Sequence, residues 1–152
     1  MSLQEELKSL KERIAELEEQ VEQEKEFPQS GERYYYIQAS GRVDSVYWGE
    51  DDTDFQIRGM GNTFRTKEEA EFSVEKLKVE AELRKFSRPF EYGKFNYHLL
   101  FDIDGNNFRT DVTSYCPSQG AIYFESEEKA QEAVSTVGEE RIKKYIFGVE
   151  DL

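Results

Sequence analysis

Residues 62–70, Asn-Thr-Phe-Arg-Thr-Lys-Glu-Glu-Ala, establish the architecture, because residues 122–130, Ile-Tyr-Phe-Glu-Ser-Glu-Glu-Lys-Ala, repeat their pattern. The two stretches align at a constant offset of 60, which pairs Phe64 with Phe124, Thr66 with Ser126 and Ala70 with Ala130. In each stretch a serine or threonine is followed by acidic residues, the pattern of a helix N-cap and first turn. The repeat therefore predicts two related modules, each joining a strand end to a helix start.

Aromatic segments of alternating polarity precede both predicted helices. They predict strands over residues 34–37, 43–48 and 55–58 in the first module, and over 95–103, 108–115 and 121–124 in the second. The helices are predicted over 67–86, 127–137 and 139–145. The fold class is therefore α+β: an N-terminal coiled-coil helix followed by two antiparallel strand–helix (ββ(β)α) modules.

The N-terminal helix, from Leu3 to about Glu24, has apolar residues in strict heptad spacing. Its a and d positions are Leu3, Leu7, Leu10, Ile14, Leu17 and Val21. Leucine at d with β-branched residues at two a positions favours a parallel dimer. In that dimer Glu6 meets Lys11 of the second chain, and Arg13 meets its Glu18. The alternative is a helix that packs on its own domain.

The sequence divides into four segments. Residues 1–27 form the predicted coiled-coil arm, and residues 28–32 form a linker that begins with Pro28. Residues 33–90 are the first strand–helix module and residues 91–152 the second. We expect residues 33–152 to form one compact unit.

The chain of 152 residues has a formal net charge of −13. The arm contributes −5, residues 28–90 contribute −2 and residues 91–152 contribute −6. This field repels polyanions, so nucleic-acid binding is disfavoured. A single cysteine excludes an intramolecular disulfide, and no apolar run reaches the length of a membrane span or signal peptide. We expect a cytoplasmic protein without membrane contact.

No catalytic, metal-binding or cofactor-binding motif is recognised. Residues 102–113 begin like a calcium loop but lack its glycine and its final acid, so a hairpin turn is expected. The acidic stretch 50–54 is expected to be a solvated loop. His98 and Cys116 would be needed together for thiol catalysis, and no orienting motif surrounds them. We expect a protein that is not an enzyme and needs no cofactor.

Two binding hypotheses remain as alternatives. Arginines beside aromatic residues on a sheet can stack single-stranded bases, and the candidate surface is Arg42, Tyr47, Trp48 and Arg58. The acidic groups of residues 91–152 could instead mimic DNA and block a host protein.

Residues 61–78 and 138–148 resemble a group of small phage and prophage proteins of Gram-positive bacteria, which often have an N-terminal coiled coil. The resemblance covers most of the chain and implies a context, while it assigns no functional residue. With the arm and the missing chemistry, it leads us to expect a homodimeric binding or adaptor protein for an unknown protein partner.

Overall fold

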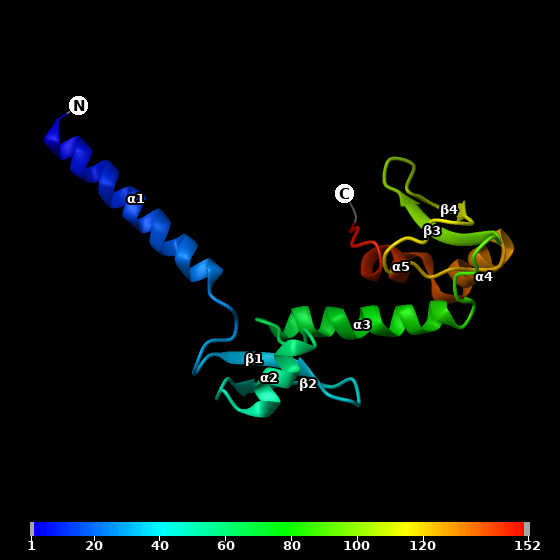
Figure 1. Ribbon diagram of the computed structural model, residues 1–152, viewed down its shortest axis with the longest axis horizontal. Helices are drawn as coiled ribbons and strands as arrows, with labels where there is room; N and C mark the ends of the chain where they lie inside the picture. Colours follow the sequence, from blue (N-terminus) through cyan, green and yellow to red (C-terminus); the bar gives the residue numbers. More distant parts are fainter. Residues whose placement is uncertain (1, 151–152) are drawn as a thin grey trace. The chain divides into compact units, whose positions relative to one another are not determined.

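The structure is a computed structural model, and it describes residues 2–150. It confirms the α+β class: a long N-terminal helix is followed by two antiparallel hairpins, each accompanied by helices (Figure 1). Contacts group the chain into two compact units, residues 1–70 and 71–152. The division lies within α3 (Lys67–Arg84), which begins in the first unit and continues into the second. The sequence-based boundary near residue 90 follows the repeat and stays a prediction.

The first unit contains α1 (Leu3–Glu24), β1 (Arg33–Ile37), β2 (Val43–Tyr47) and α2 (Asp52–Gly59). Strands β1 and β2 form an antiparallel hairpin in which Arg33 is paired with Tyr47 and Ile37 with Val43. The hairpin and the helical span of α1 agree closely with the sequence-based expectation.

The strand predicted over residues 55–58 is wrong, because these residues belong to α2. Asp51 is the N-cap: its carboxylate accepts from the Asp54 N–H at 2.8 Å, and the Asp54 carboxylate accepts from the Asp51 N–H at 3.3 Å. This reciprocal capping stabilises the helix start. The stretch 50–54, expected as a solvated loop, is thus largely the beginning of a helix, and Asp54 is buried.

The second unit contains most of α3 and the hairpin of β3 (Asn96–Asp102) and β4 (Asn107–Thr113), followed by α4 (Glu127–Val137) and α5 (Glu139–Tyr145). The turn predicted between the two strands is confirmed. Helices α4 and α5 lie against the hairpin (Figure 1). The buried core comprises Val79, Leu83, Phe124, Ala130, Ala133, Val134, Val137 and Ile142.

Each module contains the same backbone contact between its first strand and the segment that precedes its helix. In the first, Tyr35 and Phe64 exchange two backbone hydrogen bonds, both 2.9 Å; in the second, Tyr97 and Phe124 exchange bonds of 3.1 and 2.8 Å. The strand predicted over 121–124 is therefore reduced to isolated bridges. Phe64 and Phe124 occupy equivalent places, which supports the internal repeat.

The start of each hairpin extends this equivalence. Gly31 and Gly93 both have φ near +80°, a region that favours glycine. Gly31 N–H donates to the Trp48 carbonyl and Gly93 N–H to the Ser114 carbonyl. The first strands of the two hairpins, β1 and β3, therefore match at an offset of 62, which makes Leu99 the equivalent of Ile37.

The helices that follow Phe64 and Phe124 have the predicted N-caps. Thr66 Oγ1 accepts from Glu69 N–H at 3.2 Å, and Ser126 Oγ accepts from Lys129 N–H at 3.1 Å. The Glu69 carboxylate accepts a hydrogen bond from the N–H of Arg65, one residue before the cap. Local sequence signals therefore determined where α3 and α4 begin.

Candidate functional site

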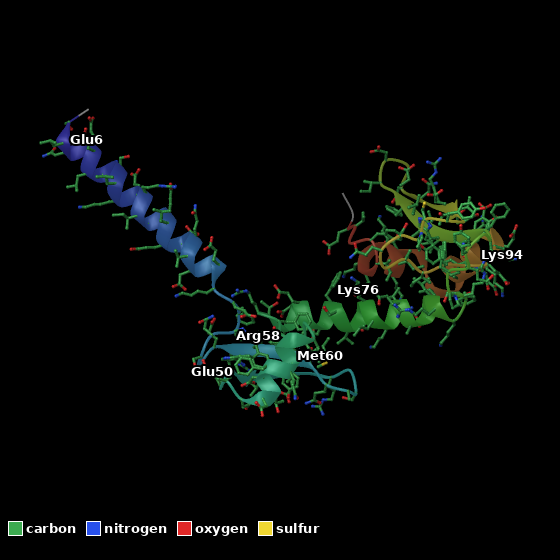
Figure 2. The ribbon with its side chains drawn as sticks, in the orientation of Figure 1. Glu6, Glu50, Arg58, Met60, Lys76 and Lys94 are labelled. Atoms are coloured by element: carbon green, nitrogen blue, oxygen red, sulfur yellow. The ribbon has the colours of Figure 1, made fainter. Side chains whose placement is uncertain are left out.

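The apolar seam of α1 is the first candidate functional surface. Its six residues are all exposed in the single chain, from 43% for Leu17 to 83% for Leu3. Figure 2 shows side chains extending from α1 along its length, with Glu6 labelled near its N-terminal end. A helix that packed on its own domain would bury this stripe. The seam is therefore available to an occupant outside the chain.

Local interactions favour α1 as a helix. Ser2 is the N-cap: its hydroxyl accepts from Glu5 N–H at 3.2 Å, and the Glu5 carboxylate accepts from Ser2 N–H at 2.8 Å. Arg13 and Glu16 form an exposed ion pair with an N–O distance of 3.2 Å. Such pairs contribute about 0.2–1 kcal/mol, so Arg13 can exchange Glu16 for another carboxylate at little cost.

The segment after α1 is anchored to the first unit. The Arg65 guanidinium lies 4.3 Å from the centroid of the Phe27 ring, and Arg58 Nε lies 3.2 Å from a Glu26 carboxylate oxygen. Pro28 is fully buried. Residues 26–28 thus pack on the first unit, where the sequence-based division had assigned residues 26 and 27 to the arm and Pro28 to the linker.

Tyr34 and Asp54 form the polar centre of the first unit. The Tyr34 hydroxyl donates to Asp54 Oδ1 at 2.6 Å, and the Gly49 N–H donates to Asp54 Oδ2 at 2.9 Å. Both side chains are buried. Burial, followed by the bond to Asp54, raises the pKa of Tyr34 above its ordinary value. The bond from Tyr34 is the main cause that lowers the pKa of Asp54, against the opposing effect of burial.

The predicted aromatic–arginine surface is only partly assembled. The Arg58 guanidinium, on α2, lies 4.4 Å from the centroid of the Trp48 ring, and Arg58 is labelled in Figure 2. Trp48 itself is only 4% exposed. Tyr47 is 66% exposed, but neighbouring strand residues point to opposite faces, so it faces away from Trp48. Arg42 lies in the turn before β2 and is exposed.

Among residues 2–150, no hydrogen bond joins His98 to Cys116, the two candidates for thiol chemistry. His98 is on β3, where it is paired with Asp111, and Cys116 is exposed after β4. The Thr113 hydroxyl accepts a hydrogen bond from the Cys116 N–H and donates one to the Cys116 carbonyl. Within residues 2–150 no group of three or more His, Cys, Asp or Glu side chains could hold a metal ion. No helix in the described chain is both long and apolar enough to cross a bilayer.

A pocket in the second unit is a further candidate site. It has a volume of about 350 Å³ and lies between the end of α3, strand β3, the 118–122 loop and residues 146–147. This volume is within the range of small binding pockets, about 300–1,000 Å³. His98 lines it, and the buried His98 Nδ1 has no hydrogen-bond partner in the described residues. Sequence patterns did not reveal this pocket, because four separate segments form it.

Comparison of the chain with models of known protein families, with curated proteins and with solved structures finds no match.

Proposed function

We propose that the chain is a non-enzymatic accessory protein that acts as a homodimer and binds a protein partner. The observation that carries this proposal is the exposed seam of α1, whose heptad spacing fits a second copy of the same helix. Burial of each aliphatic side chain would contribute about 1.5–3 kcal/mol. The resemblance of residues 61–78 and 138–148 to phage and prophage proteins supports a phage-encoded role in the bacterial cytoplasm.

The charges beside the seam favour a parallel dimer. In that arrangement Glu6 faces Lys11 of the second chain and Arg13 faces its Glu18, so both pairs attract. An antiparallel dimer would place Arg13 opposite Arg13 and Lys11 opposite Lys11, because g then meets g and e meets e. The arm spans only three heptads, a marginal length for an isolated helix pair. We therefore expect dimerisation that depends on protein concentration.

The dimer is tested by multi-angle light scattering of the full chain over a range of concentrations. Leu10→Glu with Leu17→Glu places charges in the seam and should give a monomer. The matched control, Ser9→Glu with Ala15→Glu, adds the same charge on the outer face and should keep the wild-type dimer. A wild-type monomer at high concentration, or a dimer in the seam variant, would contradict the proposal.

Nucleic-acid binding receives less support from the geometry. Arg58 is already engaged by Trp48 and Glu26, and the Trp48 ring is buried. The DNA-mimic alternative is weakened differently. Several acidic residues of the second module occupy the first turns of helices, where the helix dipole explains them: Glu127, Glu128, Glu139 and Glu140. Protein binding therefore remains the better supported function.

A further inference from the structure

We propose that the open edge of β3 and the pocket beside it bind an extended peptide segment with an apolar side chain. This inference rests on the proposed role as a binding protein and specifies the chemistry of its partner. The peptide would add a strand to β3, with main-chain hydrogen bonds giving affinity and the pocket giving specificity.

The hydrogen-bond pattern of β3 defines the open edge. Both Tyr97 backbone groups bond to Phe124, so they point away from β4. In an antiparallel pair this direction alternates, and the β3–β4 register runs unbroken to Asp102. The N–H and C=O groups of Leu99 and Phe101 therefore point to the same edge as those of Tyr97. Within residues 2–150 no hydrogen bond from this edge to Leu99 or Phe101 is found.

The first repeat shows which chemical group fits this edge. Ile37, the equivalent of Leu99, donates its N–H to Asn62 Oδ1 at 2.8 Å, and its carbonyl accepts from Asn62 Nδ2 at 2.9 Å. The Asn62 carboxamide thus occupies the edge of β1 as a peptide group would. Ile122 stands at the equivalent position of the second repeat and has no amide in its side chain. An external peptide bond can take the place that Asn62 fills in the first repeat.

The pocket beside this edge suits an uncharged apolar side chain. Its lining includes Leu83, Leu99, Ile122, Phe124 and Phe147. Leu83 and Phe124 are themselves buried core residues, so the pocket reaches the core of the second unit. The charged residues that line it, Glu80 and Arg84, form an ion pair with an N–O distance of 3.6 Å, which offsets their charges.

A third observation comes from His98. Its buried Nδ1 lacks a hydrogen-bond partner in the described residues, an arrangement that costs about 1–3 kcal/mol. The ring packs edge-on against Tyr123, with the ring centroids 5.9 Å apart, so this nitrogen is an unsatisfied polar atom beside the pocket. The open backbone edge and the apolar pocket therefore favour the same class of ligand.

The test is a titration of the ¹⁵N-labelled full chain with the capped peptide acetyl-Thr-Val-Thr-Phe-Thr-Val-Thr-amide, followed by amide NMR shifts. We expect saturable shifts centred on Leu99, Phe101 and Ile122. The same peptide, N-methylated on the alternate nitrogens that would face β3, should bind at least tenfold more weakly. Replacing its phenylalanine with alanine should weaken binding by a similar factor.

A protein variant provides an independent test. Ile122→Asn restores the amide that Asn62 provides in the first repeat, and it should weaken peptide binding at least tenfold. Ile122→Val is the matched control and should bind like the wild type. The NMR spectrum of each variant shows whether it is folded, and the N-methylated peptide tests the edge without any change in the protein.

Several outcomes would overturn the proposal. These are absence of shifts at millimolar peptide, equal binding of the N-methylated peptide, or shifts away from β3. Concentration-dependent shifts at Leu99 without peptide would assign the edge to a second copy of the chain instead. The seam variant Leu10→Glu/Leu17→Glu should retain wild-type peptide affinity per chain. Failure of the dimer and failure of the peptide site are therefore separately visible.

Discussion

The Tyr34 hydroxyl donates a 2.6 Å hydrogen bond to Asp54 Oδ1, joining β1 to α2 across 20 residues of sequence. Asp54 also accepts from the backbone N–H groups of Gly49 and Asp51. One carboxylate thereby holds the strand, the connecting loop and the helix start together. This arrangement makes Tyr34 and Asp54 the first targets for stability measurements.

Tyr34→Phe should lower the free energy of unfolding of the first unit by about 1–3 kcal/mol, because it leaves a buried carboxylate short of one donor. Urea unfolding followed by the fluorescence of Trp48, the single tryptophan, reports on this unit. Tyr36→Phe is the matched control and keeps the ring that lies 6.1 Å from the Tyr34 ring. Equal stability of the two variants would contradict the assigned role of the hydroxyl.

The stability that Asp54 contributes should depend on pH. Its folded-state pKa is lowered, so the contribution is present above the unfolded value of about 3.9 and is lost as pH falls through the folded value. The difference in unfolding free energy between wild type and Asp54→Asn should therefore shrink below about pH 4. A difference that stays constant from pH 7 to pH 2 would rule out this linkage.

The pKa of Tyr34 is raised, so the stability that Tyr34 contributes depends on pH in the opposite direction to that of Asp54. It should be complete below the unfolded value of about 10 and should decline as pH rises above it. Wild type should thus lose more stability than Tyr34→Phe between about pH 9 and pH 11. Parallel losses in the two proteins would show that the Tyr34 proton is not involved.

Asn96 should be the corresponding polar anchor of the second unit. Its Nδ2 donates at 2.9 Å to the carbonyls of Glu91, Lys94 and Thr113, and its Oδ1 accepts from Arg88 Nη1 at 2.7 Å. Asn96 is buried, and Asn96→Ala removes all of these bonds at once, so we expect a loss of about 2–4 kcal/mol.

Thermal unfolding followed by circular dichroism measures the effect of Asn96→Ala. Asn107→Ala, at an exposed position of the same hairpin, is the control and should change stability by less than about 0.5 kcal/mol. Comparable effects of the two substitutions would show that the network around Asn96 contributes little.

Charge reversal should report the orientation of the α1 dimer. Glu6→Lys sets like charges against Lys11 of the second chain and should raise the dimer Kd roughly twofold to tenfold at low salt. Adding Lys11→Glu should restore the wild-type Kd, which sedimentation equilibrium measures. Glu12→Lys on the outer face is the control for net charge. An antiparallel dimer would show no such rescue.

Single-stranded oligonucleotides should leave the fluorescence of Trp48 unchanged at low salt. The ring is buried beneath Arg58, and the chain carries a net charge of −13. Quenching by oligo-dT that disappears in the variant Arg42→Ala/Arg58→Ala would instead support the nucleic-acid hypothesis.

Sequence alone determined the features that depend on neighbours within a few residues. The heptad spacing of Leu3 to Val21 and the caps at Thr66 and Ser126 predicted helices whose observed starts agree with the prediction. Both hairpins were predicted because alternation and turn residues act locally. The offset of 60 also predicted that Phe64 and Phe124 would be equivalent, as their backbone pairing shows.

Tertiary structure decided what depends on residues far apart. The alternating pattern predicted a strand over residues 55–58. Capping by Asp51 and the buried hydrogen bond from Tyr34 to Asp54 stabilise these residues in α2 instead. The same packing buried Trp48, which the sequence had left as a candidate for base stacking. The β3 pocket and the amide of Asn62 against Ile37 likewise require segments brought together by folding. Capping and strand alternation depend on residues within one turn or one strand pair. Burial and long-range hydrogen bonds depend on which distant segments the fold brings together.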